Sequence, residues 1–122
     1  MRAGAQGEGV EPELTARGHA ERVVRRDPRA HEDLAAEAEI APPDLVDWLL
    51  SHPFTGFELV AHARIGAHHI FKTKFVGPTT LVIQARWAAD PGGTWRIREA
   101  EITRTEGGPA AAPRLAHRPG EV

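Results

Sequence analysis

The first part of the chain carries apolar residues at helical spacing. From Pro12 to Arg26, the apolar residues of one helical face are Ala16, Ala20, Val23 and Val24, with an acidic residue near the start and basic residues at the end. This pattern predicts an amphipathic helix. Asp27 and Pro28 then predict the end of this helix and the start of the next one. Apolar residues follow at nearly four-residue spacing, at Ala30, Leu34, Ala38 and Ala41. We therefore expect a second, short helix.

A third helix is predicted directly after Pro42 and Pro43, because proline is favoured at a helix start. Asp44 and Asp47 fall in its first turn, where the helix dipole stabilises carboxylates, so the pair needs no catalytic explanation. Its apolar stripe consists of Leu45, Trp48 and Leu49. Pro53 should end it.

After Gly56 the apolar period changes from helical to alternating, which predicts strands. Four strands are expected, over 57–64, 68–76, 80–88 and 94–104. Short connections rich in glycine and proline separate them, as in consecutive antiparallel hairpins. A four-stranded antiparallel meander should therefore follow the helices.

The register of these strands decides which side chains face the helices, because a slip of one residue exchanges the two faces. Three-residue turns give the most consistent faces, with Ala61 opposite Phe71 and His69 opposite Trp87. His62 then lies on the face opposite His69, whereas a two-residue turn would set these histidines across from each other. The predicted inner face contains Phe57, Leu59, Ala61, Phe71, Phe75, Leu81, Ile83, Ala85, Trp87, Trp95 and Ile97.

The last predicted strand requires a bulge. Trp95 and Ile97 have the parity of the inner face, whereas Ala100 and Ile102 have the opposite parity. An extra residue near Arg98 or Glu99 would keep all four side chains inward.

The composition fits one folded unit with two tails. The chain has 122 residues, of which 41% are hydrophobic, enough for one core. Residues 1–10 are rich in glycine and alanine, and residues 106–122 contain glycine, proline, alanine and arginine without an apolar period. Both segments are predicted to be disordered, which leaves a single α+β domain over 11–105.

Charge and residue usage exclude several classes of function. The formal charge is −2 with both signs interspersed, so no nucleic-acid partner is expected. No apolar run approaches the roughly 18 residues that span a bilayer, so we expect no membrane partner and a cytoplasmic location. The chain has no cysteine, which rules out disulfides, thiolate metal sites and cysteine nucleophiles.

Two polar residues are candidates for acid–base chemistry. His69 interrupts the predicted apolar face, and Glu99 would join it if the bulge turned its side chain inward. A buried polar group without a partner costs roughly 1–3 kcal/mol, and a pocket would supply a partner. His69 could then act as a general acid or base, with Glu99 orienting it or having a raised pKa. The alternative is that His69 lies at the sheet margin and Glu99 points outward.

Other candidates concern ligand binding rather than catalysis. Parity predicts a ligand-binding lining made of Trp48, Phe71, Thr73, Phe75 and Trp87. Simple core packing explains these aromatic residues equally well. Adjacent His68 and His69 point to opposite faces and cannot readily chelate one ion, so no metal is expected. The chain also has no phosphate-binding loop or nucleophile elbow, and no cofactor is expected.

The order of elements ends in the strand Gly93-Thr94-Trp95-Arg96-Ile97-Arg98-Glu99-Ala100-Glu101-Ile102. From about Leu14 to Thr105, the chain resembles the nuclear transport factor 2-like (NTF2-like) superfamily, with the SnoaL-like branch as the nearest comparison. The resemblance implies a cone-like α+β fold, with N-terminal helices packed on a curved antiparallel meander of four or slightly more strands. It also implies an enclosed pocket and a homodimer formed through the outer face of the sheet.

The resemblance also implies a site. Catalytic members use a pocket carboxylate with a polar partner, and Glu99 most resembles that acid. Two departures argue against a ketosteroid-isomerase mechanism. The segment between Leu34 and Asp44 is too short for the extra strand pair that many members have, and the chain has no tyrosine to donate a phenolic hydrogen bond.

Two functions remain open, and whether the protein is an enzyme is left undecided. The first is a small-molecule pocket protein: an isomerase, cyclase or hydrolase using acid–base chemistry on an apolar ring-containing substrate. The second is a non-catalytic binding or dimerisation module whose outer sheet face carries Val60, Ile70 and Val82 among charges. An open cavity beside His69 or Glu99 would favour the first, and a filled interior would favour the second.

Overall fold

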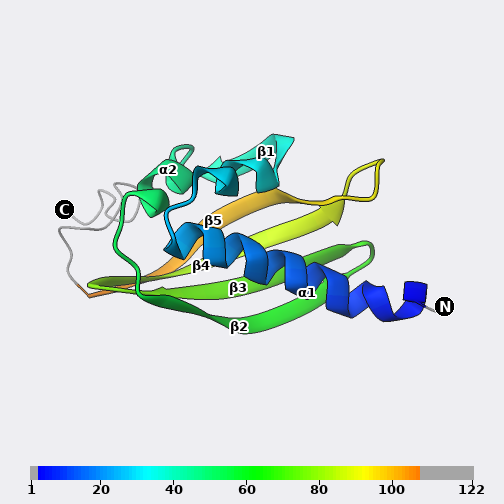
Figure 1. Ribbon diagram of the computed structural model, residues 1–122, viewed down its shortest axis with the longest axis horizontal. Coiled ribbons are helices and arrows are strands. Elements are labelled where there is room, and N and C mark those ends of the chain that lie inside the picture. Colours follow the sequence, from blue (N-terminus) through cyan, green and yellow to red (C-terminus); the bar gives the residue numbers. More distant parts are fainter. Residues whose placement is uncertain (1–2, 108–122) are drawn as a thin grey trace.

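A computed structural model describes residues 3–107 of the chain, with side chains described for 11–106. The elements in order are α1 (Ala3–Val24), the 3₁₀ helix η1 (Pro28–Asp33), β1 (Leu34–Ala41), α2 (Leu45–Leu50), β2 (Gly56–Ile65), β3 (His68–Val76), β4 (Thr79–Ala89) and β5 (Trp95–Gly107). The helices lie on one face of a five-stranded sheet of order β1-β5-β4-β3-β2 (Figure 1). The predicted α+β class, with N-terminal helices packed on an antiparallel meander, is confirmed.

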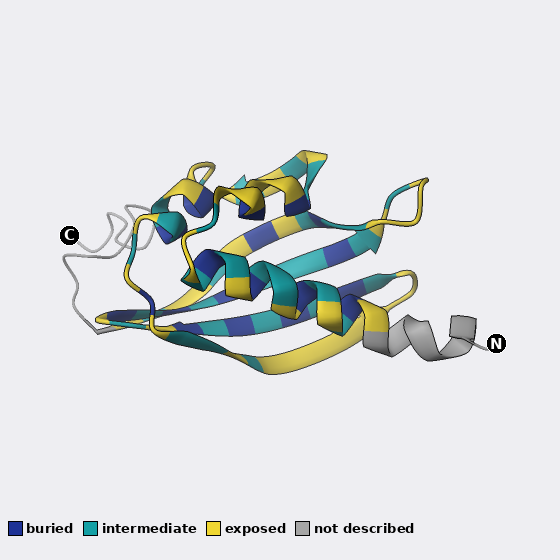
Figure 2. Cartoon of the chain, viewed as in Figure 1, coloured by how far each residue is buried: buried dark blue, intermediate teal, exposed yellow. Residues whose placement is uncertain are grey.

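The first and third predicted helices correspond to α1 and α2. α1 lies over β2 and β3, roughly along the strands, and buries the predicted apolar residues Ala16, Ala20 and Val23 (Figure 2). It begins at Ala3 rather than at the predicted Pro12. The predicted C-terminal tail lies largely outside the described residues, and the division into one domain over 11–105 stays a prediction. Neither helix in the described part of the chain has the length and apolar character needed to cross a membrane.

The second predicted helix is wrong. Residues 28–33 form only the short helix η1, and 34–41 form β1, which pairs in parallel with β5 at the edge of the sheet. Apolar residues four positions apart share a face in a helix, but they also share a face in a strand because four is an even number. Pairing with β5 decides between the two, so the sheet has one strand more than the predicted meander.

The four predicted strands are confirmed as β2 to β5, and the β3–β4 register is the predicted one. His69 lies opposite Trp87, and Phe71 lies opposite Ala85. The predicted bulge in β5 is confirmed too, because the register shifts between the Arg86–Glu99 and Trp87–Ile97 pairs and leaves Arg98 unpaired.

The first hairpin is correct at its open end and wrong near its turn. Phe57 lies opposite Phe75 as predicted, but the connection between Ile65 and His68 has two residues instead of three. Gly66 in this turn has a φ of +62°, a left-handed conformation that glycine adopts easily. A bulge between Leu59 and Ala61 absorbs the difference in register.

This bulge changes which residues of β2 face the helices. Ala61 pairs with Lys72 instead of Phe71, so its predicted place on the inner face is wrong, and Ala61 is exposed. His62 takes its place opposite Phe71. His62 and His69 therefore lie on the same face of the sheet, as the two-residue turn required.

Candidate functional site

The inner face of the sheet and the helices enclose a cavity of about 30 Å³. Three of the residues predicted to bind a ligand line it, namely Thr73, Phe75 and Trp87. The other two, Trp48 and Phe71, do not. A cavity of about 10–15 Å³ can already hold one water, so this one has room for about one or two waters and none for a ring-containing molecule.

Two polar side chains, His19 and Thr73, interrupt this apolar lining. Thr73 is only 9% exposed, and its hydroxyl forms no hydrogen bond with any other described group. His19 comes from α1 and has its own partners outside the cavity. Thr73 is among the residues predicted to bind a ligand, whereas no sequence pattern indicated His19.

His19 belongs to a buried ionic cluster with Arg22 and Asp33. His19 Nδ1 lies 2.8 Å from Asp33 Oδ2, and Arg22 Nη2 lies 2.8 and 2.9 Å from the two carboxylate oxygens. Asp33 is 9% exposed, so the carboxylate is held almost entirely inside the protein. Each of its oxygens accepts a bond from a cation or an imidazole, which offsets the cost of burying the charge.

The end of α1 brings the members of this cluster together. His19 and Arg22 are three residues apart and so share one helix face. Arg26 adopts φ +58°, Arg26 N–H donates to the Val23 carbonyl, and Asp27 N–H donates to the Arg22 carbonyl. This pair of bonds ends the helix and reverses the chain. η1 then returns alongside α1 and places Asp33 beneath the helix.

The electrostatics of the cluster define the proton positions. Burial alone would raise the pKa of Asp33, but hydrogen bonds from His19 and Arg22 outweigh it and lower the pKa. The carboxylate is therefore ionised and can only accept, so His19 Nδ1 carries a proton and donates. In a neutral ring, Nε2 is then the acceptor. The ring meets Trp87 edge-on with centroids 5.8 Å apart.

His69 is buried, but it does not line the cavity. Its Nδ1 lies 2.8 Å from His62 Nε2, so the two imidazoles share a hydrogen bond, and its ring lies perpendicular to that of Trp95 with centroids 5.3 Å apart. The ring of His62 stacks on Phe71 with centroids 4.2 Å apart. The prediction that His69 interrupts the inner face is confirmed, while its partner is His62 rather than a pocket ligand or Glu99.

Glu99 lies on the outer face, as in the alternative interpretation of the bulge. Its carboxylate is 2.8 Å from Arg86 Nη2, and its side chain is 49% exposed. The hydrogen bond and the charge of Arg86 lower the pKa of Glu99, so the suggested rise caused by apolar walls is wrong. Because Trp87 and Arg86 are neighbours on one strand, their partners His69 and Glu99 lie on opposite faces and do not share a site.

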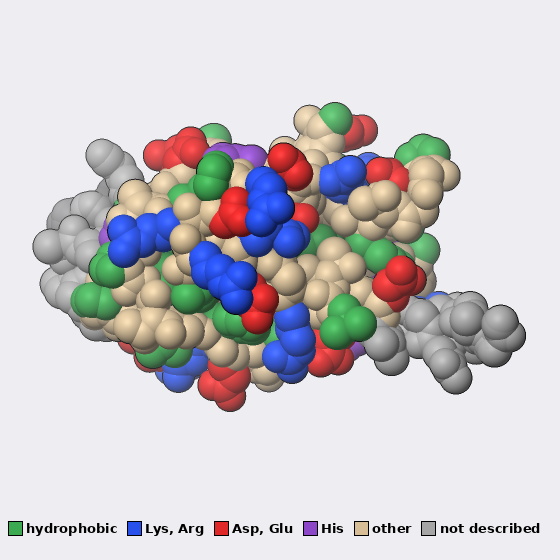
Figure 3. All heavy atoms as spheres, in the orientation of Figure 1, with side chains coloured by type: hydrophobic (Ala, Val, Ile, Leu, Met, Phe, Trp, Pro, Cys, Tyr) green, Lys and Arg blue, Asp and Glu red, His purple; other side chains and the backbone are tan. Residues whose placement is uncertain are grey.

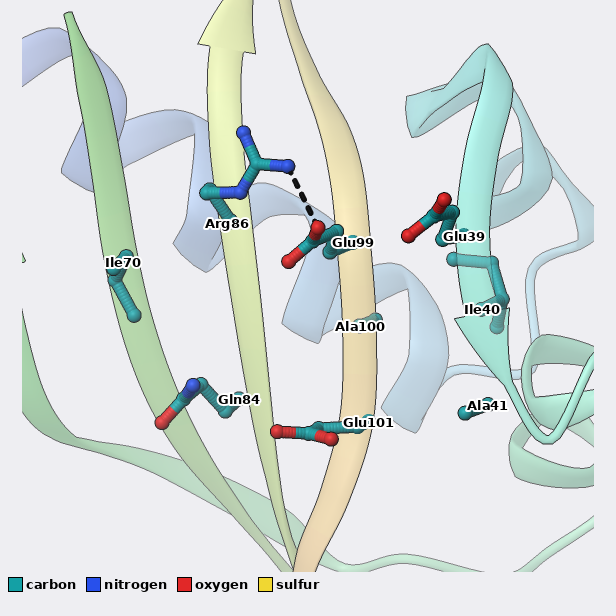
Figure 4. Close-up of a pocket in the computed structure, with 9 residues that line it drawn as sticks. All are labelled: Glu39, Ile40, Ala41, Ile70, Gln84, Arg86, Glu99, Ala100 and Glu101. Atoms are coloured by element: carbon teal, nitrogen blue, oxygen red, sulfur yellow. Dashed lines mark ion pairs between the residues drawn. The ribbon is translucent and has the colours of Figure 1, made fainter.

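Two hollows larger than the inner cavity lie on this outer face. One of about 340 Å³, the acidic hollow, lies over β1, β5, β4 and β3 (Figure 4). Its polar lining is Glu39, Gln84, Arg86, Glu99 and Glu101. A second of about 520 Å³, the basic hollow, is lined by Val60, Lys72, Lys74, Val82, Thr103, Arg104 and Glu106. On the face covered by α1, in contrast, acidic and basic side chains lie side by side (Figure 3).

The described residues provide little for a metal ion. No three His, Asp or Glu side chains between residues 11 and 106 come together as a ligand set. The pair of imidazoles from His62 and His69 supplies two nitrogens, which already bond to each other. The polar groups of the inner face are therefore arranged for hydrogen bonding.

Comparison with known proteins identifies the fold. No protein-family model and no curated protein matches the sequence. An NTF2-like protein of unknown function from Shewanella baltica OS155 superposes with a TM-score of 0.65 at 11% identity, over 85% of this chain and 97% of that one. An NTF2-like superfamily protein from Salmonella enterica serovar Typhimurium LT2 gives 0.58 at 15% identity, over 91% and 100%. At these identities only the fold follows, without a branch: the chain has the cone-like α+β fold of NTF2-like proteins.

Proposed function

We propose that this chain is a non-catalytic binding module that acts through the outer face of its sheet. The observation that carries the proposal is the contrast in free volume between the two faces. The enclosed inner cavity measures about 30 Å³, whereas the outer face has hollows of about 340 and 520 Å³.

The filled interior argues against a ring-containing substrate. Pockets for ligands of that size usually have volumes of about 300–1,000 Å³. The cone here is closed by Trp87, Phe75 and Leu45, each at most 2% exposed. The burial of Phe71, Phe75 and Trp87 supports the alternative explanation, in which the large aromatic residues of the inner face serve as core.

The outer face has the features of an interaction surface. No helix among the described residues covers it (Figure 1). Val60 is 45% exposed, and Ile70 and Val82 are partly exposed among charged neighbours that line the hollows. Apolar groups within a charged rim are typical of protein-binding surfaces.

Retention of partner proteins tests this proposal. Tagged full-length chain would be recovered from the cells that make it, and the retained proteins, including untagged copies of the chain, would be quantified. The double variant Ile70→Asp, Val82→Asp should lose at least about 90% of the retained partner, because it places charge at the centre of the surface. The control Glu21→Arg, on exposed α1, should retain it. Equal retention by the double variant, or no partner for the wild type, would refute the proposal.

A second candidate function is favoured by the polar groups of the inner cavity. Thr73 presents a buried hydroxyl without a described partner, and His19 presents an imidazole whose Nδ1 is fixed by Asp33. His19 Nε2 could take a proton from a small bound molecule while Asp33 stabilises the imidazolium that forms. This candidate requires the cavity to widen, and it transfers the predicted acid–base role from His69 and Glu99 to His19.

A thermal-shift screen distinguishes this candidate. Small apolar ring compounds that carry a hydroxyl or carbonyl group would be tested against the wild type and the variant His19→Ala. The pocket function predicts at least one compound that raises the melting temperature of the wild type but not of the variant. No stabilising compound, or equal stabilisation of both proteins, would leave the outer face as the functional surface.

A further inference from the structure

Three arginine side chains line a further hollow, which we call the arginine hollow. It measures about 200 Å³ and lies between the end of α1, the helix η1 and the start of β5. Pockets for drug-sized ligands are usually larger, at about 300–1,000 Å³, so this hollow suits a small chemical group. Its lining residues are Arg22, Arg29, Glu32, Asp33 and Arg96.

Asp27 holds Arg29 in place. Its carboxylate caps η1 by accepting from Arg29 N–H at 3.0 Å, and it also accepts from Nε and Nη2 of Arg29, the latter at 2.7 Å. The side-chain hydrogen bond from Arg29 is the main cause that lowers the pKa of Asp27 to about 2, so the carboxylate stays ionised near neutral pH. Arg29 Nη1 forms no hydrogen bond with a described group and can donate to a ligand.

The other two guanidinium groups are held in a similar way. Arg22 uses Nε and Nη2 on Asp33, which leaves Nη1 without a partner among the described residues. Arg96 Nη1 donates to the Glu32 carbonyl, and Arg96 Nε lies 3.5 Å from Asp90, which leaves Nη2 without a described partner. Each arginine therefore keeps a terminal nitrogen for a ligand, while its other nitrogens fix the side chain.

The charges of the lining favour an anion. The three arginines outnumber the two carboxylates, so the lining has a net charge of about +1 near neutral pH. The carboxylate of Asp33 is neutralised by its ion pair with Arg22 at 2.8 Å. Glu32 forms no salt bridge with a described side chain, so within this lining it is the carboxylate that would oppose an anion.

We propose that the arginine hollow binds a phosphate group, either as the free ion or as a phosphate monoester. A phosphate group has three oxygens that accept hydrogen bonds strongly, so it can bond to guanidinium groups from α1, η1 and β5 at once. A carboxylate has only two oxygens. Because the arginines are already held in place, binding costs little further side-chain entropy. This site is separate from the outer face and does not depend on the function proposed for that face.

Calorimetric titration of the full-length chain tests the proposal. The ionic strength is kept low and constant, because salt screens charges at the surface. Inorganic phosphate and phenyl phosphate represent the two sources of the group, and the wild type should bind at least one of them saturably, with one site per chain. Tighter binding of phenyl phosphate would indicate a monoester as the ligand, and tighter binding of inorganic phosphate would indicate the free ion. Acetate should bind on the order of 10-fold more weakly, because it leaves one arginine without an acceptor.

Substitutions in the lining locate the bound phosphate. Arg29→Gln and Arg96→Gln should each weaken binding on the order of 10-fold, because each removes a charged donor. Arg104→Gln is a matched control: the side chains of Arg29 and Arg104 are both 70% exposed and both pair with a carboxylate, but Arg104 lies in the basic hollow. This control should bind as the wild type does. No saturable binding of either phosphate compound, equally tight binding of acetate, or a loss in Arg104→Gln but not in Arg29→Gln would overturn the proposal.

Glu32→Gln should increase affinity, an effect that a misfolded variant would not produce. It removes the opposing carboxylate from the lining and should tighten phosphate binding about 5-fold. Glu101→Gln is the control, since Glu101 is also exposed and forms no salt bridge with a described side chain, but lines the acidic hollow. Its affinity should equal that of the wild type. An unchanged affinity in Glu32→Gln, or equal gains in the two variants, would overturn the assignment of the phosphate to the arginine hollow.

Discussion

The two faces of the sheet are built from the same strands but use their residues in opposite ways. On β4, Trp87 points inward and is 1% exposed, while its neighbour Arg86 points outward and pairs with the half-exposed Glu99. The helices pack so closely on the inner face that a cavity of only about 30 Å³ remains there, whereas the outer face has larger hollows lined by charged side chains. This difference in free volume is the basis for proposing the outer face, rather than the inner one, as the binding surface.

Truncating the centre of the inner face should give the largest effect. Trp87→Ala removes a fully buried side chain that contacts His19, and should lower the free energy of unfolding by about 3–5 kcal/mol. The matched outer variant Arg86→Ala loses a partly exposed ion pair and should cost less than about 1 kcal/mol. Urea unfolding at one fixed protein concentration measures both. Equal losses would mean that the two faces are equally structural.

The buried ionic cluster should give the next largest effect. Asp33→Ala leaves His19 and Arg22 without their carboxylate, and should cost about 2–3 kcal/mol of unfolding free energy. Asp47→Ala is a matched control, because Asp47 also contacts a histidine, His31, at 2.8 Å but its side chain is 73% exposed. That control should cost less than about 1 kcal/mol. Similar values in urea unfolding would show that burial of Asp33 adds nothing.

The pH dependence of stability should identify the same carboxylate. Because the pKa of Asp33 is lowered in the folded protein, its contribution is complete above the unfolded value of about 3.9 and is lost as the pH falls towards the folded pKa. The difference in unfolding free energy between wild type and Asp33→Asn should therefore shrink as the pH falls below about 4. Hydrogen bonds from Arg29 lower the pKa of Asp27 to about 2, but Asp27 is present in both proteins and cancels in the difference. A constant difference across this range would contradict the cause given for the lowered pKa.

The strands and their faces could be predicted because successive side chains of a strand point to opposite faces. An alternation of apolar and polar residues therefore shows which side chains are buried. The bulge in β5 followed from Ala100 and Ile102 having the wrong parity for a continuous strand, and it is present. β1 could not be recognised, because its alanine and glutamate residues favour helices and its apolar spacing fits either structure. This segment is a strand because it pairs with the edge of β5. β5 is distant in sequence, so the local residue pattern gives no sign of this pairing.

The polar groups of the inner face were harder to predict than the fold. His19 lies on the helix face that also carries Ala16 and Val23, so a polar residue within that stripe was the available signal. Its partner Asp33 comes from η1, in a segment predicted as helix, and the turn that brings it back depends on a left-handed Arg26. The position of His62 depended on the choice between two turn lengths, which spacing alone left open.

A substitution in the turn between β2 and β3 should have a moderate effect on the free energy of unfolding. Gly66→Ala adds a side chain at φ +62° with no atom within 4 Å, so only backbone strain applies, at about 1 kcal/mol. Gly56→Ala is the control, since it meets no atom within 4 Å and lacks a positive φ. Urea unfolding should show a loss for the first and less than about 0.5 kcal/mol for the second. Equal losses would argue against the two-residue turn and against the place of His62 on the inner face.

Removal of the outer carboxylate should have the smallest effect. Glu99→Gln keeps the size of a side chain that is 49% exposed and replaces an ion pair with Arg86. Surface pairs contribute little, so the unfolding free energy should change by less than about 0.5 kcal/mol. The measurement belongs at concentrations where the chain is monomeric, so that contacts between copies do not contribute. A loss as large as that of Asp33→Ala would mean that Glu99 is buried. Glu99 would then again be a candidate for the pocket carboxylate that the family resemblance implies.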